Sequence, residues 1–388
     1  MNIIIFEDKL TSNLKPFSFN HATFEVKTGM FSNIDRFKTI FRNDNLYLIV
    51  RKEIEEIISE KYSDLSINPE EIPKGFCING KVVWRNKYNR LLNKDLKNSK
   101  LLFYNNLENV SIDKFYHTDF FSNHINDDLE LRKIDYLWDA IDLFDNQFNE
   151  DFNLLDTDTK FEFPSSSHFI QKDKIKINKD SIIRPGCVLD AEKGPIVIKS
   201  NVIVDIGSKI QGPVFIDDDV FLSSGANIKS KALIGPGCKV GGEISNTIFH
   251  ANSNKVHDGF LGHSYVGEWV NIGAGTNNSN LKNNYSTVKF SFGDDTIDTK
   301  RLFLGCMIGD YTRIGISSML NTGTFIGIGS NVFGAGFQNK FISPFSWGKN
   351  NRVDFEKFID TCINMKKRRH KNLSNSEKNI LEKLYNSL

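Results

Sequence analysis

The chain has 388 residues, long enough for two domains, and its net charge of +1 calls for neither nucleic acid nor an anionic membrane as a partner. It opens with a brief apolar run followed by acidic residues, so we expect no signal peptide, and no apolar stretch is long enough to span a bilayer. The five cysteines form no CxxC pair, which is typical of reduced core thiols in a cytoplasmic protein.

The first 160 residues alternate short buried strands with helices. Strands are predicted at 3–6, 46–50 and 101–104, and helices at 31–41, 53–65 and 127–149. This alternation favours a small α/β domain over residues 1–160. Glu7 and Asp8 follow the first strand and could hold a metal, although two acids after a strand more often belong to a turn.

A period of six residues dominates the middle of the chain. The large aliphatic positions of the first run are Ile198, Val204, Ile210, Ile216, Leu222, Ile228, Ile234 and Val240. The register returns at Leu302, Ile308, Ile314, Leu320, Ile326 and Val332. Small or β-branched residues follow four positions after each. A period of six fits neither a strand nor a helix, so it predicts a solenoid.

Each hexad is expected to supply one short strand and one tight corner, with three hexads closing a triangular coil. The aliphatic side chains point inward and stack at the strand spacing of about 4.8 Å. We expect six to seven coils over residues 161–350, with 281–301 extruded as a loop. Two basic helices follow at 354–370 and 374–388, within a tail of residues 351–388, and Ser374 and Glu377 have the spacing of a capping box.

The segment between the two hexad runs carries the chemically useful side chains. His257 precedes the point where the repeat resumes, on an irregular segment over a rigid scaffold, and an imidazole suits a general base near neutral pH. Alone, it would more often be a structural histidine. Lys255, the sequence VNIGAGT at 270–276 and a series of asparagines surround it.

This segment resembles the acetyltransferase domain of GlmU, the bifunctional enzyme that acetylates glucosamine 1-phosphate and then uridylylates it. The resemblance implies a left-handed β-helix and makes His257 the base that deprotonates the sugar amine. Acetyl-CoA would be held by backbone at Gly273, Ala274 and Gly275. The implied substrate-binding residues are Glu243, Lys255, Asn271, Asn280, Asn284 and Tyr285.

Ser245 and Asn246 stand where the family has phosphate-binding lysines, and Phe260 replaces a family tyrosine. The phosphate-binding site of the family is therefore altered. Lys255, Lys282 or Arg301 could supply the positive charge that the missing lysines would provide. The whole chain is similar to a divergent, GlmU-like branch of Bacteroidetes-type sugar nucleotidyltransferases. The shared stretches are KVGGE (239–243), SNKVHDGFLG (253–262), TNNSNLKNNY (276–285) and FSWG (345–348).

That resemblance implies a nucleotidyltransferase-like domain before the β-helix, with Mg²⁺ if it is active. However, no glycine-rich loop follows the first strand, and His21-Ala22 replaces the Arg-Pro of the branch. The leading hypothesis is acetyl transfer from acetyl-CoA to an amino sugar or its phosphate, with a backbone N–H near Gly273–Gly275 stabilising the oxyanion. It would be coupled to nucleotide-sugar synthesis for the cell envelope, in a cytoplasmic homotrimer without nucleic-acid or membrane partners.

Three alternatives stay open. The chain could be a sugar-1-phosphate nucleotidyltransferase only, or a non-catalytic sugar-nucleotide-binding protein. It could also be a zinc hydratase of the γ-carbonic-anhydrase kind, with His250, His257 and His263 as the metal ligands.

Overall fold

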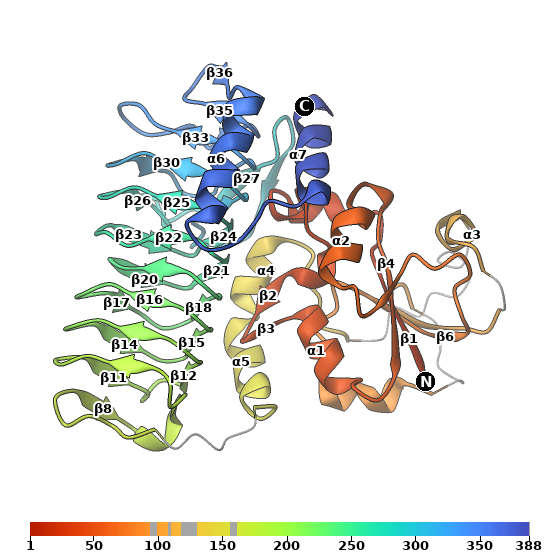
Figure 1. The fold of residues 1–388 in the computed structure, drawn as a ribbon, viewed down its shortest axis with the longest axis horizontal. Helices are drawn as coiled ribbons and strands as arrows, with labels where there is room; N and C mark the ends of the chain where they lie inside the picture. Colours follow the sequence, from red (N-terminus) through yellow and green to blue (C-terminus); the bar gives the residue numbers. More distant parts are fainter. Residues whose placement is uncertain (94–98, 108–109, 118–129, 156–160, 388) are drawn as a thin grey trace.

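The computed structural model describes all residues except 94–98, 108–109, 118–129, 156–160 and 388. Figure 1 shows a tall stack of short strands beside a smaller α/β part, with the C-terminal helices lying against both. No helix among the described residues has the length and apolar character needed to cross a membrane.

The α/β part is built on a five-stranded sheet in the order β5-β4-β1-β6-β7. Its strands are β1 (Asn2–Phe6), β4 (Asn45–Ile49), β5 (Ser66–Ile67), β6 (Gly75–Asn79) and the antiparallel β7 (Leu102–Asn105). The helices α1 (Asn33–Ile40), α2 (Glu55–Lys61) and α3 (Ile112–His117) complete it. Ile3, Ile4 and Ile5 of β1 are all fully buried, because apolar clusters cover both faces of the sheet. The predicted strands and the first two predicted helices are confirmed.

The long helix predicted at 127–149 is confirmed only from residue 137 onward, and there as two helices. Residues 127–129 lie outside the described residues, and helix begins only with α4 (Leu137–Asp142), followed by α5 (Phe144–Phe152). Backbone N–H groups of Val83 and Ile134 bond to the carbonyls of Arg132 and Lys81, at 2.9 Å each. The segment before α4 is therefore extended, because its backbone pairs with a neighbouring chain segment despite the helix-like spacing of its apolar residues.

The repeat region is a triangular prism of parallel strands. Its first face is ten-stranded: β10 (Ile182–Ile183), β13 (Ile203–Val204), β16 (Phe221–Leu222), β19 (Lys239–Val240), β22 (Asn254–Lys255), β25 (Asn271–Ile272), β30 (Arg313–Ile314), β33 (Asn331–Val332), β35 (Ser346–Trp347) and β36 (Asn351–Arg352). The second has β8 (His168–Ile170), β11 (Val188–Asp190), β14 (Lys209–Gln211), β17 (Asn227–Ile228), β20 (Glu243–Ser245) and β23 (Phe260–Gly262), continued by the pair β26 (Asn277–Asn278) and β31 (Met319–Leu320). The third is nine-stranded: β9 (Ile175–Ile177), β12 (Ile196–Ile198), β15 (Val214–Ile216), β18 (Ala232–Ile234), β21 (Thr247–Ala251), β24 (Tyr265–Glu268), β29 (Cys306–Ile308), β32 (Thr324–Ile326) and β34 (Phe341–Ile342).

The hexad period is confirmed by the register. Ile198, Ile216 and Ile234 are direct partners in successive coils, and all eight aliphatic positions of the first run are buried in one core cluster. The nine strands of the third face exceed the six to seven coils expected, because coils outside the strict period also join the ladder. Leu302, expected inside, is 48% exposed. The hand of the coil and the three domain boundaries stay predictions.

The third face joins the two parts of the molecule. The outward residues Val197, Phe215 and Leu233 are buried with Trp138 and Phe148 of α4 and α5 in a single cluster. The predicted loop 281–301 forms the hairpin β27 (Lys289–Ser291) and β28 (Thr296–Asp298), whose Phe290 ring packs 5.1 Å from Trp138. Three-residue apolar strands such as Ile196–Ile198 are buried on both sides, which explains their lack of alternation.

Both ends of the prism are covered. Phe161, Phe163 and Phe169 pack against the core at the first coil, and β36 pairs antiparallel with β35 at the last. The C-terminal helices α6 (Phe355–Lys367) and α7 (Asn375–Ser387) follow. The Ser374 hydroxyl accepts a bond from the Glu377 N–H at 3.2 Å, but the Glu377 carboxylate bonds Tyr311 and Lys366, so only half of the predicted capping box forms.

Trimming one interior aliphatic residue gives a modest test of this register. Ile216→Val should lower the free energy of unfolding by about 0.5–1.5 kcal/mol, because Ile216 is fully buried in the prism. Ile206 is 54% exposed at a corner, so Ile206→Val should change it by less than about 0.5 kcal/mol. Urea unfolding of both variants measures the difference, and equal losses would contradict the assigned interior.

Candidate functional site

His257 lies at a corner of the prism, between β22 on the first face and β23 on the second. Its side chain is exposed, while its backbone carbonyl accepts a hydrogen bond from the Lys255 ammonium at 2.9 Å. The next residue, Asp258, accepts the N–H of Gly275 at 2.9 Å through its carbonyl. The imidazole therefore stands on a corner fixed by the backbone, directly against the coil that carries VNIGAGT.

Gly273, Ala274 and Gly275 form the same corner one coil further on. A Cβ on Gly273 would lie 2.7 Å from the Ile316 nitrogen, and Gly275 has φ +69°, so neither position accommodates a side chain easily. The Gly273 N–H donates to Ile314 and the Gly275 N–H to Asp258. Two of the three expected oxyanion donors are thus engaged, which leaves the Ala274 N–H as the candidate. Asn271, exposed on β25, pairs in register with Asn254.

The other predicted substrate-binding amides lie at the opposite edge of the second face. The Asn280 amide contacts Nδ1 of His263 at 2.9 Å, and the His263 ring stacks on Phe303. Burial and the nearby charge of Lys231 lower the pKa of His263 to about 4, so this imidazole is neutral near pH 7. Asn284 closes its own loop through Ser286, and Tyr285 is 71% exposed.

One chain therefore does not bring His257 and Asn280 together. His257 and His263 lie at opposite corners of the coil that contains β23, six residues apart in sequence. At about 3.3 Å per residue, the extended path between them approaches about 20 Å. The predicted site residues form two groups, one at each edge of the second face.

Glu243 and Lys255, both predicted to bind substrate, are otherwise engaged. The Glu243 carboxylate pairs with Lys229 at 2.7 Å. Lys255 is 1% exposed and is the register partner of Val240, so it occupies an inward, aliphatic position of the prism. Its role as a direct substrate ligand is wrong for this conformation, because its ammonium is held inside by main-chain carbonyls. Burial lowers the pKa of Lys255 to about 8, against a smaller opposing effect of Asp258.

Lys255→Met should therefore stabilise the fold near pH 7, by about 1–3 kcal/mol, since a buried ammonium is replaced by an apolar chain of similar length. A folded-state pKa near 8 against an ordinary value of 10.5 means that the wild-type chain regains stability as the pH rises through that interval. The difference in unfolding free energy between Lys255→Met and the wild type should therefore become smaller as the pH rises from about 8 to 10.5. Urea unfolding at pH 7 and pH 10.5 checks this, and a less stable variant at pH 7 would contradict it.

The zinc alternative is wrong. His250 is buried on the third face, His257 is exposed at one corner and His263 bonds Asn280 at another. Across the described part of the chain, no three His, Cys, Asp or Glu side chains are grouped so as to hold a metal ion. The three imidazoles lie on the third face and at two different corners of the prism, so one chain does not group them around a single ion.

A cavity of about 500 Å³ lies at the carboxyl ends of β1 and β4 in the α/β part. Glu7, Asp8, Lys9, Arg51 and Lys52 all line it. The Glu7 carboxylate is paired with Arg51 at 2.6 Å, and Asp8 is paired with Lys81 at 2.8 Å. Burial raises the pKa of Glu7, although Arg51 opposes this. Both acids would have to exchange these cations to bind Mg²⁺, so the arrangement does not favour them as a metal pair.

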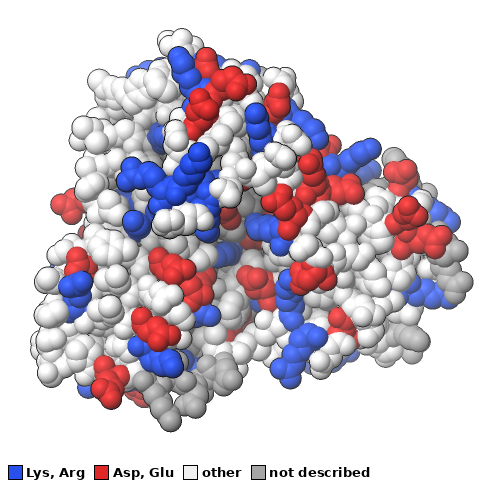
Figure 2. Space-filling model, viewed as in Figure 1, with Lys and Arg blue, Asp and Glu red and all other residues white. Residues whose placement is uncertain are grey.

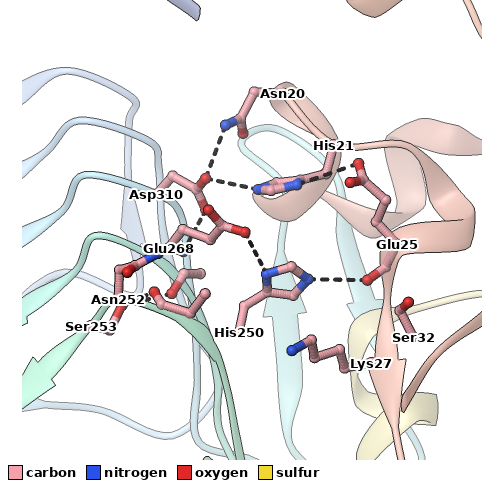
Figure 3. Close-up of polar contacts among 12 residues, drawn as sticks. Asn20, His21, Glu25, Lys27, Ser32, His250, Asn252, Ser253, Glu268 and Asp310 are labelled. Carbon is pink, nitrogen blue, oxygen red and sulfur yellow. Dashed lines mark hydrogen bonds and ion pairs between the residues drawn. The ribbon is translucent and has the colours of Figure 1, made fainter. Parts of the chain in front are cut away.

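A buried polar cluster connects the two parts of the molecule (Figure 3). Nε2 of His21 lies 2.8 Å from the Asp310 carboxylate, and its Nδ1 lies 3.5 Å from Glu25. Nδ1 of His250 lies 2.8 Å from Glu268, with its Nε2 3.1 Å from the Glu25 carbonyl. Burial alone lowers the pKa of His21, but Asp310 and Glu25 outweigh it and raise the value to about 10. His21 is therefore a cation that binds the α/β part to the prism.

The basic tail is also partly engaged. Figure 2 shows Lys and Arg gathering near the end of α6, among mixed charges elsewhere on this face. Arg369 donates to Asn254 at 2.8 Å and to the Gly237 carbonyl at 2.5 Å, and Lys371 donates to Asn252 at 3.2 Å. These bonds hold the tail on the prism one coil before Asn271.

Comparison with known proteins finds a family for the first part of the chain and relatives that match part of its length. Residues 3–160 match the family described as sugar nucleotidyl transferase. The bifunctional protein GlmU of Wigglesworthia glossinidia brevipalpis is 31% identical over 162 residues, 41% of this chain and 30% of that protein. The chain is GlmU-like.

Other relatives point the same way. A bifunctional sugar-1-phosphate nucleotidylyltransferase/acetyltransferase of Sulfurisphaera tokodaii is 27% identical over 157 residues, covering 35% of this chain and 39% of that protein. An uncharacterized acetyltransferase, YaiX, of Escherichia coli is 29% identical over 160 residues, 40% of this chain and 70% of that protein. The chain spans about a third of the length of the GlmU proteins it matches.

Among solved structures, the UDP-N-acetylglucosamine acyltransferase of Campylobacter jejuni aligns with a TM-score of 0.23 and 12% identity, over 56% of this chain and 94% of that one. The relatives named here are transferases. These comparisons support a likeness to GlmU, but they do not identify a substrate.

Proposed function

We propose that this protein is an acetyltransferase that moves the acetyl group of acetyl-CoA to the amino group of a sugar or sugar phosphate. The observation that carries the proposal is the exposed His257 imidazole on a corner held against Gly273–Gly275. That corner offers a base and one uncommitted N–H, from Ala274, side by side. The likeness to GlmU and to other acetyltransferases supports the same chemistry.

In the proposed reaction, the sugar amine attacks the thioester carbonyl while His257 accepts a proton from the nitrogen. A nitrogen–carbon bond forms and the carbon–sulfur bond breaks, and the leaving CoA sulfur takes the proton back from the imidazolium. The Ala274 N–H donates to the oxyanion of the tetrahedral intermediate. Asn271, exposed one coil above Asn254, would orient the acceptor.

The active unit that we propose is a homotrimer, with each site shared by two prisms. His257 and Asn280 lie at opposite edges of one face, so side-by-side packing of two copies would bring the His257 edge of one against the Asn280 edge of the next. Asn280, Asn284 and Tyr285 would then serve the base of the neighbouring copy. Residues 1–160, 161–350 and 351–388 act as separate domains in this proposal.

The test is a CoA-release assay with acetyl-CoA and a panel of amino sugars and amino-sugar phosphates. His257→Ala and Asn280→Ala should each be inactive. When the two variants are co-expressed, random assembly should place an intact His257 beside an intact Asn280 of the neighbouring copy in about a quarter of the sites. The mixture should therefore regain about a quarter of the wild-type activity. An inactive mixture with active wild-type protein would place both residues in one copy. Absence of turnover with every acceptor would contradict acetyl transfer itself.

Nucleotidyl transfer is the second candidate function. The cavity at the carboxyl ends of β1 and β4 is where open α/β sheets bind nucleotides, and Lys9, Arg51 and Lys52 offer positive charge there. The two activities together would make a nucleotide sugar. Pyrophosphate release from a nucleoside triphosphate and a sugar 1-phosphate tests this independently of CoA release. Binding of a nucleotide sugar without either turnover would favour a non-catalytic role.

A further inference from the structure

A second cavity lies on the prism, between the loop that follows β26 and the coil that follows β31. It measures about 500 Å³, within the range that holds small ligands, and Lys282, Asn284, Asn321, Thr322 and Phe337 are among its lining residues. Phe337 is 60% exposed, so an aromatic ring borders the opening. Among the residues that the structure describes, no carboxylate lines this cavity.

Two amides that line the cavity, those of Asn284 and Asn321, have hydrogen-bond donors to spare. The Asn284 side-chain oxygen already accepts from the Ser286 N–H at 3.1 Å and from its hydroxyl at 2.9 Å. The Asn321 side-chain oxygen accepts from the Thr322 N–H at 2.9 Å. Because backbone donors fix the orientation of both amides, their NH₂ groups remain for a ligand. A donor-lined cavity without carboxylates is suited to an anion.

Two ammonium groups add positive charge: Lys282 lines the cavity, and Lys340 lies behind the lining residue Thr322, which it contacts. Lys282 donates to the Thr287 carbonyl at 2.5 Å and to Ser286 at 3.3 Å, and Lys340 donates to Thr322 at 3.3 Å. All three acceptors are neutral, and within the described residues neither lysine has a carboxylate at ion-pair distance. Burial, and then the charge of Lys282, lower the pKa of Lys340. Two cations that disfavour each other would gain from a shared anion.

The other basic residues considered for this role are excluded by their contacts. Lys255 is inside the prism. Arg301 pairs with Asp139 at 2.7 Å and also with Asp142, both on α4. Lys282 is thus the candidate that keeps an accessible charge, and it lies two residues after Asn280, on the edge of the second face opposite His257.

We propose that this cavity is a phosphate-binding subsite, with Lys282 and Lys340 as its cationic ligands and the amides of Asn284 and Asn321 as neutral donors. It would take over the role of the phosphate-binding lysines that Ser245 and Asn246 replace, using residues from a later part of the chain. The assignment of its phosphate to a substrate rests on the proposed acetyl transfer, but the subsite itself does not.

Inorganic phosphate, titrated into the full-length protein and followed by ³¹P line broadening, tests the subsite directly. Lys282→Gln and Lys340→Gln should each raise the dissociation constant about tenfold, because each removes a charge-assisted hydrogen bond. Lys282→Arg should retain binding. Lys300→Gln is the matched control, since Lys300 lies nearby in sequence but pairs with Asp298. Unchanged binding in the double Lys282→Gln/Lys340→Gln variant, or no binding to the wild type, would overturn the proposal.

Kinetics then identify where the phosphate comes from. If it belongs to the acceptor, Lys282→Gln should raise the KM for an amino-sugar phosphate but leave that of the unphosphorylated amino sugar unchanged. If it belongs to the cofactor, the KM should rise for acetyl-CoA and remain unchanged for acetyl-pantetheine, which lacks phosphate. Equal increases with all four compounds would contradict a phosphate subsite, even if acetyl transfer itself is confirmed.

Discussion

Replacing His257 with alanine should lower kcat for acetyl transfer by about 10²–10⁴-fold, the usual contribution of a positioned general base. The imidazole is exposed, so its removal leaves no buried partner unsatisfied and should not unfold the protein. KM for acetyl-CoA should change little, because the neighbouring backbone of Gly273–Gly275 is held by bonds to Ile314 and Asp258 that do not involve this side chain. Steady-state CoA release over a range of both substrate concentrations separates the effect on kcat from the effect on KM.

His168 provides the matched control for that variant. It is an exposed histidine on β8, in the first coil of the same second face, far along the stack from the corner of His257. His168→Ala should keep full activity. If His257→Ala retains more than about a tenth of the wild-type kcat, the imidazole is not the base and the proposed step is wrong.

Replacing His21 with leucine should cost about 3–5 kcal/mol of unfolding free energy, the largest stability effect expected in this protein. The variant leaves the Asp310 carboxylate buried without its cation, whereas Glu25 keeps Lys61, and breaking a buried pair from one side is strongly destabilising. Adding Asp310→Asn should recover part of the loss, since the second change removes the stranded charge. A double-mutant cycle by urea unfolding gives the coupling energy.

The same pair makes stability depend on pH. The pKa of His21 is raised from 6.5 to about 10 in the fold, so its contribution is complete below pH 6.5 and disappears as the pH rises through about 10. Wild-type protein should therefore lose stability between these values, whereas His21→Leu should lack that component. Lys255→Met is a useful reference, because Lys255 acts in the opposite direction from pH 8 upward. Parallel pH profiles for wild type and His21→Leu would contradict the assigned imidazolium.

The prism was predictable because its period is a local property of the sequence. Each interior residue, such as Ile216, meets its own equivalent one coil away, so spacing alone determines the partner. The segment before α4 was not predictable in this way. Leu131 and Ile134 have helical spacing, but hydrogen bonds between the flanking backbone and residues 81–83 are long-range and leave no mark on that spacing.

The site was predictable in part for the same reason. VNIGAGT and His257 fall on consecutive coils, so their proximity follows from the repeat. The inward direction of Lys255 was not predictable from the period, because Lys255 follows its register partner Val240 by 15 residues instead of the 18 that three hexads give. Similarly, His21 and Asp310 are separated by 289 residues and belong to different parts of the molecule. Nothing local in either segment indicates that contact.

The closed ends of the prism have a consequence for how copies of this chain meet. An open coil presents a full set of parallel strand edges, on which a second molecule could continue the ladder indefinitely and grow a fibre. Here aromatic rings cover the first coil, and the reversed direction of β36 ends the last one. Both features disfavour continuation of the parallel ladder along the axis, which is consistent with the proposed homotrimer forming through the flanks of the prism, where contacts can close into a ring of fixed size.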